Sequence, residues 1–444
     1  MIFKRKIYNK LLNWKNSSNG HSALLIEGAR RIGKSTVAEL FAKNEYESYI
    51  LIDFAFAPSH IQDLFKDLSD LDYFFLQLQL QYGVKLVNRK SLIIFDEVQF
   101  NPLARQAIKM LVKDGRYDYI ETGSLISIKK NIKNILLPSE ERKIEMHPLD
   151  FEEFLWAIGD NDLPDLIKMA CEKKISLGEN QNRNLMRKFR LYMLVGGMPQ
   201  AIFTYNQQNN FEMVDAVKRD IIHLYMNDFF KIDSKGKISS LYQSIPSELN
   251  KHTVSYQISS VLPHDRKNTI KEEISELIAS KTVLPSYNVY DPSSGLSYMY
   301  SSDKFRLYLS DTGLLVTLMF MDKDFTDNMI YQKLLNDKLP VNMGIVYENV
   351  VAQILTTKGK NLFYHTFKEK EQKRNYEIDF LLAEDNGKIS PIEVKSSGYK
   401  THKSIDIFAQ KYSKKIERKI LLYTKDLKKD KDVLCLPMYM VPWL

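Results

Sequence analysis

The stretch Gly28-Ala-Arg-Arg-Ile-Gly33-Lys34-Ser35-Thr36 decides the fold of this 444-residue chain, because it matches the phosphate-binding pattern G-x-x-x-x-G-K-[ST]. An apolar run, Ala23-Leu-Leu-Ile26, precedes it as a buried strand would, and a helical run follows from Ser35. Glycines at both ends let backbone N–H groups turn inward around a phosphate, and the start of the helix adds partial positive charge. We expect Lys34 to contact the β- and γ-phosphates of ATP and Ser35 to bind Mg²⁺. The other nucleotide-binding residues expected in this loop are Gly28, Arg30, Arg31, Gly33 and Thr36.

A second motif, Ser91-Leu-Ile-Ile-Phe-Asp96-Glu97, is an apolar run that ends in two carboxylates. A strand buried on both faces would carry these acids to its carboxyl end, where ligands bind in open α/β sheets. We predict that Asp96 orients the Mg²⁺ ion through its water shell and that Glu97 polarises the attacking water as general base. A strand that ends in two acids is common, so the assignment depends on the phosphate loop upstream.

A third run, Tyr117-Asp-Tyr-Ile-Glu-Thr122-Gly123-Ser124, ends in hydroxyl residues at the place where a polar side chain would sense the γ-phosphate. We assign this role to Thr122 or Ser124. The alternative is a hydroxyl that only satisfies nearby backbone groups. ATP hydrolysis also needs a cation near the transition state, and surface solvation is the alternative reason for each arginine in this region. The candidates are Arg30, Arg31 and Arg142.

Four segments in the same order along the chain resemble one family. They are Asp96-Glu97-Val98-Gln99, Thr122-Gly123-Ser124, Pro148-Leu-Asp-Phe-Glu-Glu-Phe154 and Gly196-Gly197-Met198-Pro199. The chain resembles, over nearly its whole length, the bacterial and archaeal AAA-type ATPases with a C-terminal domain of unknown function, DUF4143. The resemblance implies an enzyme that hydrolyses ATP. Family members usually have Gly-Pro-Arg-Gln where this loop has Gly28-Ala29-Arg30-Arg31, a change that adds a charge beside the phosphate contacts.

A separate set of charged residues near the C-terminus resembles the core of PD-(D/E)xK nucleases. Glu348 lies in an expected helix, Asp379 in a strand expected over 376–382, and Glu393-Val394-Lys395 at the end of the next strand. Alternation along a strand places Glu393 and Lys395 on one face, beside Asp379 on the neighbouring strand. Two facing carboxylates are costly unless a cation joins them. We therefore predict a second Mg²⁺ or Mn²⁺ at Asp379 and Glu393, with Glu348 as an outer contact.

Lys395 would then activate a water molecule or steady the phosphate under attack. Two alternatives stay open for this region. The acid and lysine would also pair on an ordinary solvated strand, and families keep such folds for binding after the chemistry is lost.

The distribution of charge favours a nucleic-acid partner, which we expect to be DNA. Residues 341–444 hold 19 Lys/Arg and 13 Asp/Glu, a net charge of +6 out of +8 for the whole chain. Basic side chains gather on one loop and on the following helix, where they would track a phosphate backbone. They are Lys368, Lys370, Lys373, Arg374, Lys400, Lys403, Lys411, Lys414 and Lys415. The alternatives are a solvated lysine-rich face and a protein partner.

The expected fold class is α/β, in four parts: a P-loop NTPase core with a parallel sheet at 1–160, a helical lid at 161–237, a winged-helix-like unit at 238–316, and a nuclease-like α/β domain at 317–444. The candidate recognition helix of the third part, Thr269–Ile278, carries more acids than bases, which favours packing against protein. The wing is expected as strands over 282–290 and 296–300, joined by a turn at 291–295. No apolar run is long enough for a membrane span, and the N-terminus lacks a signal-peptide core, so we expect a cytoplasmic protein.

Two functions from different classes follow. In the first, ATP turnover gates metal-dependent cleavage of DNA by the C-terminal domain. In the second, the protein is a switch that does not cleave: ATP controls assembly, and the C-terminal domain only docks nucleic acid or a protein.

Overall fold

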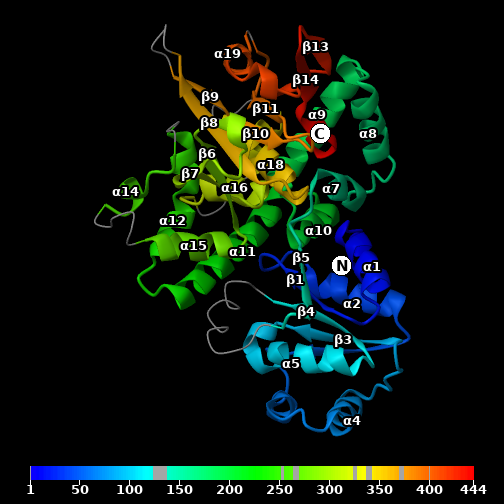
Figure 1. The fold of residues 1–444 in the computed structure, drawn as a ribbon. Helices are drawn as coiled ribbons and strands as arrows, with labels where there is room; N and C mark the ends of the chain where they lie inside the picture. The colour runs from blue at the N-terminus through cyan, green and yellow to red at the C-terminus, as the bar shows by residue number, and fades with distance from the viewer. Residues whose placement is uncertain are drawn as a thin grey trace. The chain divides into compact units, whose positions relative to one another are not determined.

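The computed structural model describes residues 2–123, 138–251, 255–263, 270–323, 328–336, 343–369, 375–399 and 401–444 (Figure 1). The chain divides into two compact units. The first comprises Met1–His147 and Ala279–Lys281, and the second comprises Pro148–Ile278 and Thr282–Leu444. The first unit thus ends before the expected boundary near residue 160, and the division into four parts stays a prediction.

The first unit is built on a parallel sheet of five strands in the order β2-β3-β4-β1-β5. Its strands are β1 Ala23–Glu27, β2 Ser48–Asp53, β3 Ser91–Asp96, β4 Asp118–Thr122 and β5 Glu141–Glu145. Its helices are α1 Ile7–Ser18, α2 Lys34–Glu45, α3 Ser59–Asp63, α4 Leu71–Tyr82 and α5 Pro102–Asp114. The predicted α/β fold with a parallel sheet is confirmed. Strand β4 lies between β1 and β3, so all three motifs end at the same edge of the sheet.

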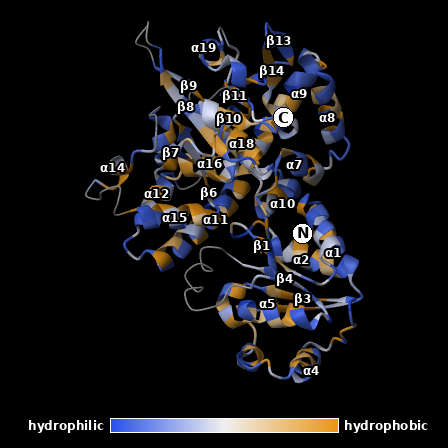
Figure 2. Ribbon diagram, viewed as in Figure 1, coloured by the Kyte–Doolittle hydropathy of each residue, from blue (hydrophilic) through white to orange (hydrophobic). Residues whose placement is uncertain are grey.

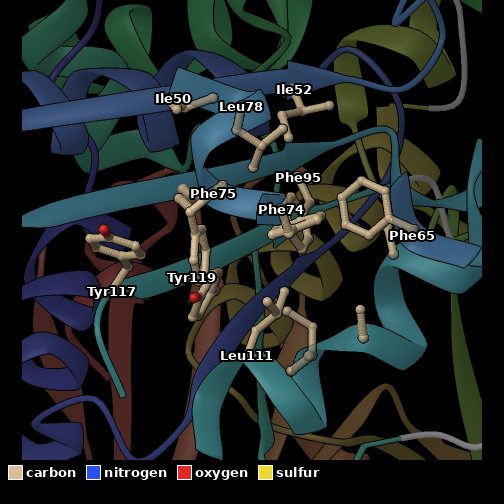
Figure 3. Packing of buried hydrophobic residues seen from close by; sticks show 14 of the residues in the cluster. Ile50, Ile52, Phe65, Phe74, Phe75, Leu78, Phe95, Leu111, Tyr117 and Tyr119 are labelled. Carbon is tan, nitrogen blue, oxygen red and sulfur yellow. The ribbon is translucent and has the colours of Figure 1, made fainter. Parts of the chain in front are cut away.

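An aromatic core fills one face of this sheet, between strands β2 to β4 and helices α4 and α5 (Figure 3). Phe65 packs edge-to-face on Phe95, with ring centroids 5.4 Å apart, and on Phe74 at 5.2 Å. Successive residues of a strand point to opposite faces. Because Phe95 of β3 lies in this core, the next residue, Asp96, is directed to the other face of the sheet.

The second unit begins with helices and continues into two mixed sheets. The helices are α7 Phe151–Ala157, α8 Leu163–Lys173, α9 Glu179–Val195, α10 Pro199–Gln208, α11 Phe211–Ile232, α12 Lys237–Gln243, α13 Ile245–Asn250, α14 Ile258–Val261, α15 Lys271–Ala279, α16 Thr312–Met319, α17 Asn328–Leu335, α18 Met343–Thr357 and α19 Lys403–Lys411. Helices α16 and α18 are coloured mostly as hydrophobic in Figure 2, and most of their residues are buried. No helix in the described ranges is long and apolar enough to cross a membrane.

The two sheets of this unit have the orders β7-β6-β8-β9 and β10-β11-β12-β14-β13. Their strands are β6 Val283–Val289, β7 Tyr300–Leu309, β8 Leu362–Lys368, β9 Asn375–Ile378, β10 Phe380–Ala383, β11 Ile389–Val394, β12 Lys419–Tyr423, β13 Lys428–Asp430 and β14 Val433–Pro437. Strand β6 of the winged-helix-like region pairs in parallel with β8. The β6–β7 hairpin therefore shares a sheet with strands from beyond residue 317.

The second strand of the expected wing is also displaced. We expected it at 296–300, and it begins at Tyr300 instead. A 3-10 turn, Pro292–Ser294, lengthens the loop, and the Asp291 carboxylate holds it by accepting from the Ser293 N–H at 2.9 Å. The turn residues extend the hairpin loop beyond the length expected from the sequence.

A close backbone contact joins α9 to α16. Helix α9 ends at Val195, and Gly196 caps it. A Cβ atom at Gly313 would lie 2.6 Å from Gly196 Cα, closer than any side chain permits. The Asp311 carboxylate accepts from the Gly197 N–H at 2.5 Å and from the Leu314 N–H at 2.9 Å. The glycines thus allow two helix ends to meet through main-chain atoms.

Candidate functional site

The phosphate loop leaves β1 and turns into α2, as the sequence predicts. A Cβ atom at Gly28 would lie 2.3 Å from the Met146 carbonyl oxygen, so only glycine fits there. Gly33 has φ = 94° and caps the N-terminus of α2, a conformation that glycine adopts without strain. The loop therefore brings the N-terminus of α2, with its unsatisfied N–H groups, to the carboxyl edge of the sheet.

Lys34 is buried against the inside of this loop. Its Nζ donates to the carbonyl oxygens of Gly28 at 3.1 Å and Ala29 at 2.8 Å. Burial lowers the pKa of Lys34 from 10.5 to about 8, although the charges of Glu97 and Asp96 act in the opposite direction. An ammonium group held only by carbonyl oxygens in a buried position suits an anionic ligand, since phosphate oxygens would restore its charged form.

Asp96 joins three elements at the sheet edge. Its Oδ1 accepts from the hydroxyl of Ser35 on α2 at 2.7 Å and from the hydroxyl of Thr122 on β4. A serine hydroxyl beside an aspartate carboxylate is a pair of hard oxygen donors, the type that Mg²⁺ prefers. The donor set therefore fits the implied magnesium ion. The contact also links the predicted sensor residue directly to the predicted metal ligand.

Glu97 follows Asp96 in a left-handed conformation, with φ = 52°. This conformation is costly for a residue with a Cβ atom, and such strain is concentrated at functional sites. The 3-10 turn Val98–Phe100 follows, and the side-chain amide of Gln99 donates to the Glu97 carboxylate. We did not single out Gln99 from the sequence, although it belongs to the segment that carries the family resemblance.

The other predicted residues of the loop differ in exposure. Arg30 is half-buried, whereas Arg31 and Thr36 are exposed. Arg142 is exposed on β5. Ser124 lies outside the described residues.

Arg5 is a residue of this site that the sequence did not indicate. Its guanidinium donates to the carbonyl oxygen of Ile32 in the phosphate loop at 2.9 Å and to that of His147 at 2.6 Å. It thereby ties the loop to the segment that follows β5. The only signal was its place in a short basic run, which is too common to assign such a contact.

The predicted C-terminal residues meet at the junction of the two sheets in the second unit. We expected one strand over 376–382, but it is interrupted at Asp379: β9 pairs with β8, and β10 pairs with β11. The β10–β11 register places Asp379 opposite Glu393, and the Val394 N–H donates to Asp379 Oδ2 at 2.7 Å. Lys395 Nζ lies 2.6 Å from Glu393 Oε1. The structure thus brings Asp379, Glu393 and Lys395 together.

The electrostatics of this site are unfavourable for two charged acids. Burial raises the pKa of Asp379 well above its usual value, and the charges of Glu348, Glu377 and Glu393 raise it further. Glu393 Oε2 is buried and has no hydrogen-bond partner among the described residues. A cation would relieve both conditions, so Asp379 and Glu393 fit one.

Glu348, the third residue expected at the metal, does not form a metal-binding group with Asp379 and Glu393 in the described part of the chain. Glu348 on α18 accepts from the Tyr308 hydroxyl at 3.3 Å. Within the described part of the chain, no group of three or more His, Cys, Asp or Glu side chains is placed to hold a metal ion. The second metal therefore stays a prediction.

A cavity of about 370 Å³ opens at these residues and is also lined by Lys403, one of the predicted basic side chains. Lys368, Lys414 and Lys415 are exposed, and Lys411 lies over the ring of Phe367 at 5.6 Å. The other predicted basic residues, Lys370, Lys373, Arg374 and Lys400, lie outside the described residues.

Comparison with known proteins identifies three segments of the chain. Residues 20–155 match an AAA domain, residues 186–324 a domain of unknown function, DUF8612, and residues 343–440 the domain of unknown function DUF4143. No curated protein matches the sequence.

Solved structures similar to this one include a Walker-type ATPase and a branch migration motor. The Walker-type ATPase PABY2304 of Pyrococcus abyssi is 13% identical, with 72% of this chain and 96% of that chain covered and a TM-score of 0.44. The RuvB Holliday junction branch migration motor of Thermotoga maritima is also 13% identical, with 63% and 89% covered and a TM-score of 0.29. The chain therefore carries an AAA domain in its N-terminal third and a DUF4143 domain at its C-terminal end.

Proposed function

We propose that the first unit binds ATP with Mg²⁺ and hydrolyses it at the carboxyl edge of its sheet. One observation carries the proposal: the Asp96 carboxylate accepts hydroxyl hydrogen bonds from both Ser35 and Thr122. These residues come from α2, β3 and β4, so three elements bring polar groups together at the carboxyl edge of the sheet. The buried ammonium of Lys34 completes the site with positive charge.

Each residue then has a distinct role. Lys34 exchanges its carbonyl acceptors for phosphate oxygens, and Ser35 and Asp96 hold Mg²⁺, which supplies charge neutralisation when bound. Glu97 accepts a proton from the attacking water, and Gln99 orients its carboxylate. Thr122 is a positioning residue, because it acts on the site through Asp96.

The test separates binding from hydrolysis. We expect Lys34→Ala to abolish nucleotide binding, measured by calorimetry. We expect Glu97→Gln to bind ATP as wild type does and to lose about 10²- to 10⁴-fold in kcat, the usual contribution of a general base. Glu47→Gln is the matched control, because Glu47 is exposed in the same unit and pairs with Lys90. Unchanged turnover in Glu97→Gln removes the general-base assignment.

For the C-terminal domain we propose metal-dependent cleavage of a phosphodiester bond in DNA. Asp379 and Glu393 face each other across β10 and β11, and Lys395 extends beside them. Mg²⁺ commonly binds to only one or two carboxylates while it keeps several waters, so this pair is sufficient without Glu348. In this role Lys395 stabilises the charge that develops on the phosphate.

The second candidate function is a switch that docks nucleic acid or a protein without cleaving it. The Lys395–Glu393 ion pair favours it, because each group already neutralises the other at 2.6 Å. Supercoiled and single-stranded DNA incubated with Mg²⁺ or Mn²⁺, with and without ATP, separates the two functions. Cleavage that is lost in Lys395→Ala but kept in Lys388→Ala, an exposed lysine paired with Glu417, supports the enzyme. No cleavage with any metal or substrate supports the switch.

A further inference from the structure

A second hollow of the second unit lies beside the carboxylate site. It is a groove of about 590 Å³ between α9 and the loops that follow β11 and β12. Residues 397–399 of the first loop line this groove, and Lys395, just before them, lines the cavity at Asp379. The groove and the cavity are therefore connected by one short segment of chain, at the carboxyl ends of parallel strands, where α/β sheets bind ligands.

The groove is positively charged. Arg183 and Arg190 come from α9, Lys425 comes from the loop after β12, and Lys428 is the first residue of β13. Two acids, Glu179 and Asp426, also line it. Glu179 is exposed and lies 3.6 Å from Arg183.

The charge of Asp426 is already compensated by hydrogen bonds. Its carboxylate accepts from the Gly178 N–H at 2.6 Å, the Ser176 hydroxyl at 2.6 Å and the Leu427 N–H at 2.7 Å. Asp426 thus anchors the segment before α9, and the basic side chains determine the charge offered to a ligand.

Asn182 gives the groove a second, independent feature. Its side chain is only 6% exposed, and its Nδ2 donates to the Thr424 carbonyl oxygen at 3.2 Å. Its Oδ1 meets no donor in the ranges that the structure covers. A buried amide oxygen without a donor destabilises the protein, so a ligand N–H or O–H group that bonds to it would be stabilised here.

We propose that this groove binds one strand of a polynucleotide and leads it to the cavity at Asp379 and Glu393. Arg183, Lys425 and Lys428 contact phosphates, and Asn182 accepts from a base N–H or a ribose hydroxyl. The volume lies within the roughly 300–1,000 Å³ of small-ligand sites, which fits nucleotides of a single strand rather than the width of a duplex. The proposal rests on the function proposed for the C-terminal domain and names the substrate form that this domain takes.

The experiment measures binding alone, so that it does not depend on ATP turnover or cleavage. Fluorescently labelled oligothymidine, oligouridine and a DNA duplex are titrated with the full chain in EDTA, without ATP, over a range of salt concentrations. We expect both single strands to bind more tightly than the duplex. Tighter binding of oligouridine than of oligothymidine identifies a ribose contact, and the reverse or equal binding identifies a base contact.

The double variant Arg183→Ala/Lys425→Ala tests the charges. We expect at least tenfold weaker binding. The magnitude of the salt slope, which is the slope of log K against log salt concentration, should be lower by about 1.4, the value for two lost phosphate contacts on a single strand. The matched control is Lys66→Ala/Lys113→Ala, which removes two exposed lysines from the first unit and is expected to leave both quantities unchanged.

The variant Asn182→Leu tests the neutral contact. We expect weaker binding with an unchanged salt slope, and circular dichroism establishes that the variant is folded. Single strands that do not bind, a clear preference for the duplex, or a groove double variant that binds as its control does would each overturn the proposal. Because binding is measured in EDTA without ATP, a failure of cleavage is distinguishable from a failure of the groove.

Discussion

Nucleotide affinity should fall steeply with pH above neutrality, because in the proposed site the ammonium form of Lys34 contacts the phosphates. Burial lowers its pKa to about 8 in the unliganded protein. The neutral fraction therefore rises from about a quarter at pH 7.5 to almost all at pH 9.5. If only the ammonium form binds, the apparent Kd rises about 25-fold over this interval. The phosphates of ATP add little to this change, because a phosphate with a last pKa of about 6 is almost fully ionised at pH 7.5.

The assay is calorimetric titration with a non-hydrolysable ATP analogue at several pH values, in buffers of different ionisation enthalpy. Binding above pH 8 should take up close to one proton. Lys34→Arg is the control, because a guanidinium stays charged over the whole range. The same variant also controls for titration of Lys218, a buried lysine of the second unit. Burial lowers the pKa of Lys218 to about 8 as well. A flat wild-type affinity, or an equal slope in Lys34→Arg, would refute the reasoning.

Three further predictions concern stability and turnover. Lys34→Met should raise the free energy of unfolding of the first unit by about 1 kcal/mol at pH 7, measured with denaturant. The reason is that burial of the charged ammonium costs roughly 3 kcal/mol, which is more than its two hydrogen bonds contribute to stability. This cost disappears as the pH rises from about 8 to 10.5, so the stability gain of Lys34→Met should vanish over that range. A denaturant midpoint at pH 7 that is lower in Lys34→Met than in wild type would contradict the prediction. Thr122→Val removes the hydroxyl that bonds to Asp96 and should lower kcat about tenfold in steady-state assays; an effect on KM alone would argue against a positioning role. Gly313→Ala places a methyl group 2.6 Å from Gly196 Cα and should destabilise the second unit by about 1–3 kcal/mol or more, so a wild-type unfolding curve would show that the helix ends are not in contact.

The sequence predicted those parts of the fold that depend on local pattern. The apolar runs before Gly28 and before Asp96 are β1 and β3, as expected, because a strand that is buried on both faces consists of a continuous run of apolar residues. The meeting of Asp379 and Glu393 also followed from a local rule, since a hairpin and a two-residue period fix which side chains face each other. The roles of all these residues stay predictions.

Long-range pairing could not be predicted in the same way. The run around Asp379 has the pattern of one strand, but its two halves join different sheets, and only contacts with β8 and β11 decide that. Likewise, nothing near Arg5 in the sequence shows that it bonds to Ile32 and His147. The winged-helix expectation failed to anticipate the pairing of β6 with β8 for the same physical reason.

The contact between Gly196 and Gly313 limits how this protein can vary. Most helix pairs adjust to mutation by exchanging large and small side chains across their interface, but these two ends have none to exchange. Glycine has no smaller replacement, so sequence drift elsewhere in α9 and α16 cannot compensate for a change at either position. Homologues that keep this arrangement should therefore hold both glycines fixed while the residues around them diverge.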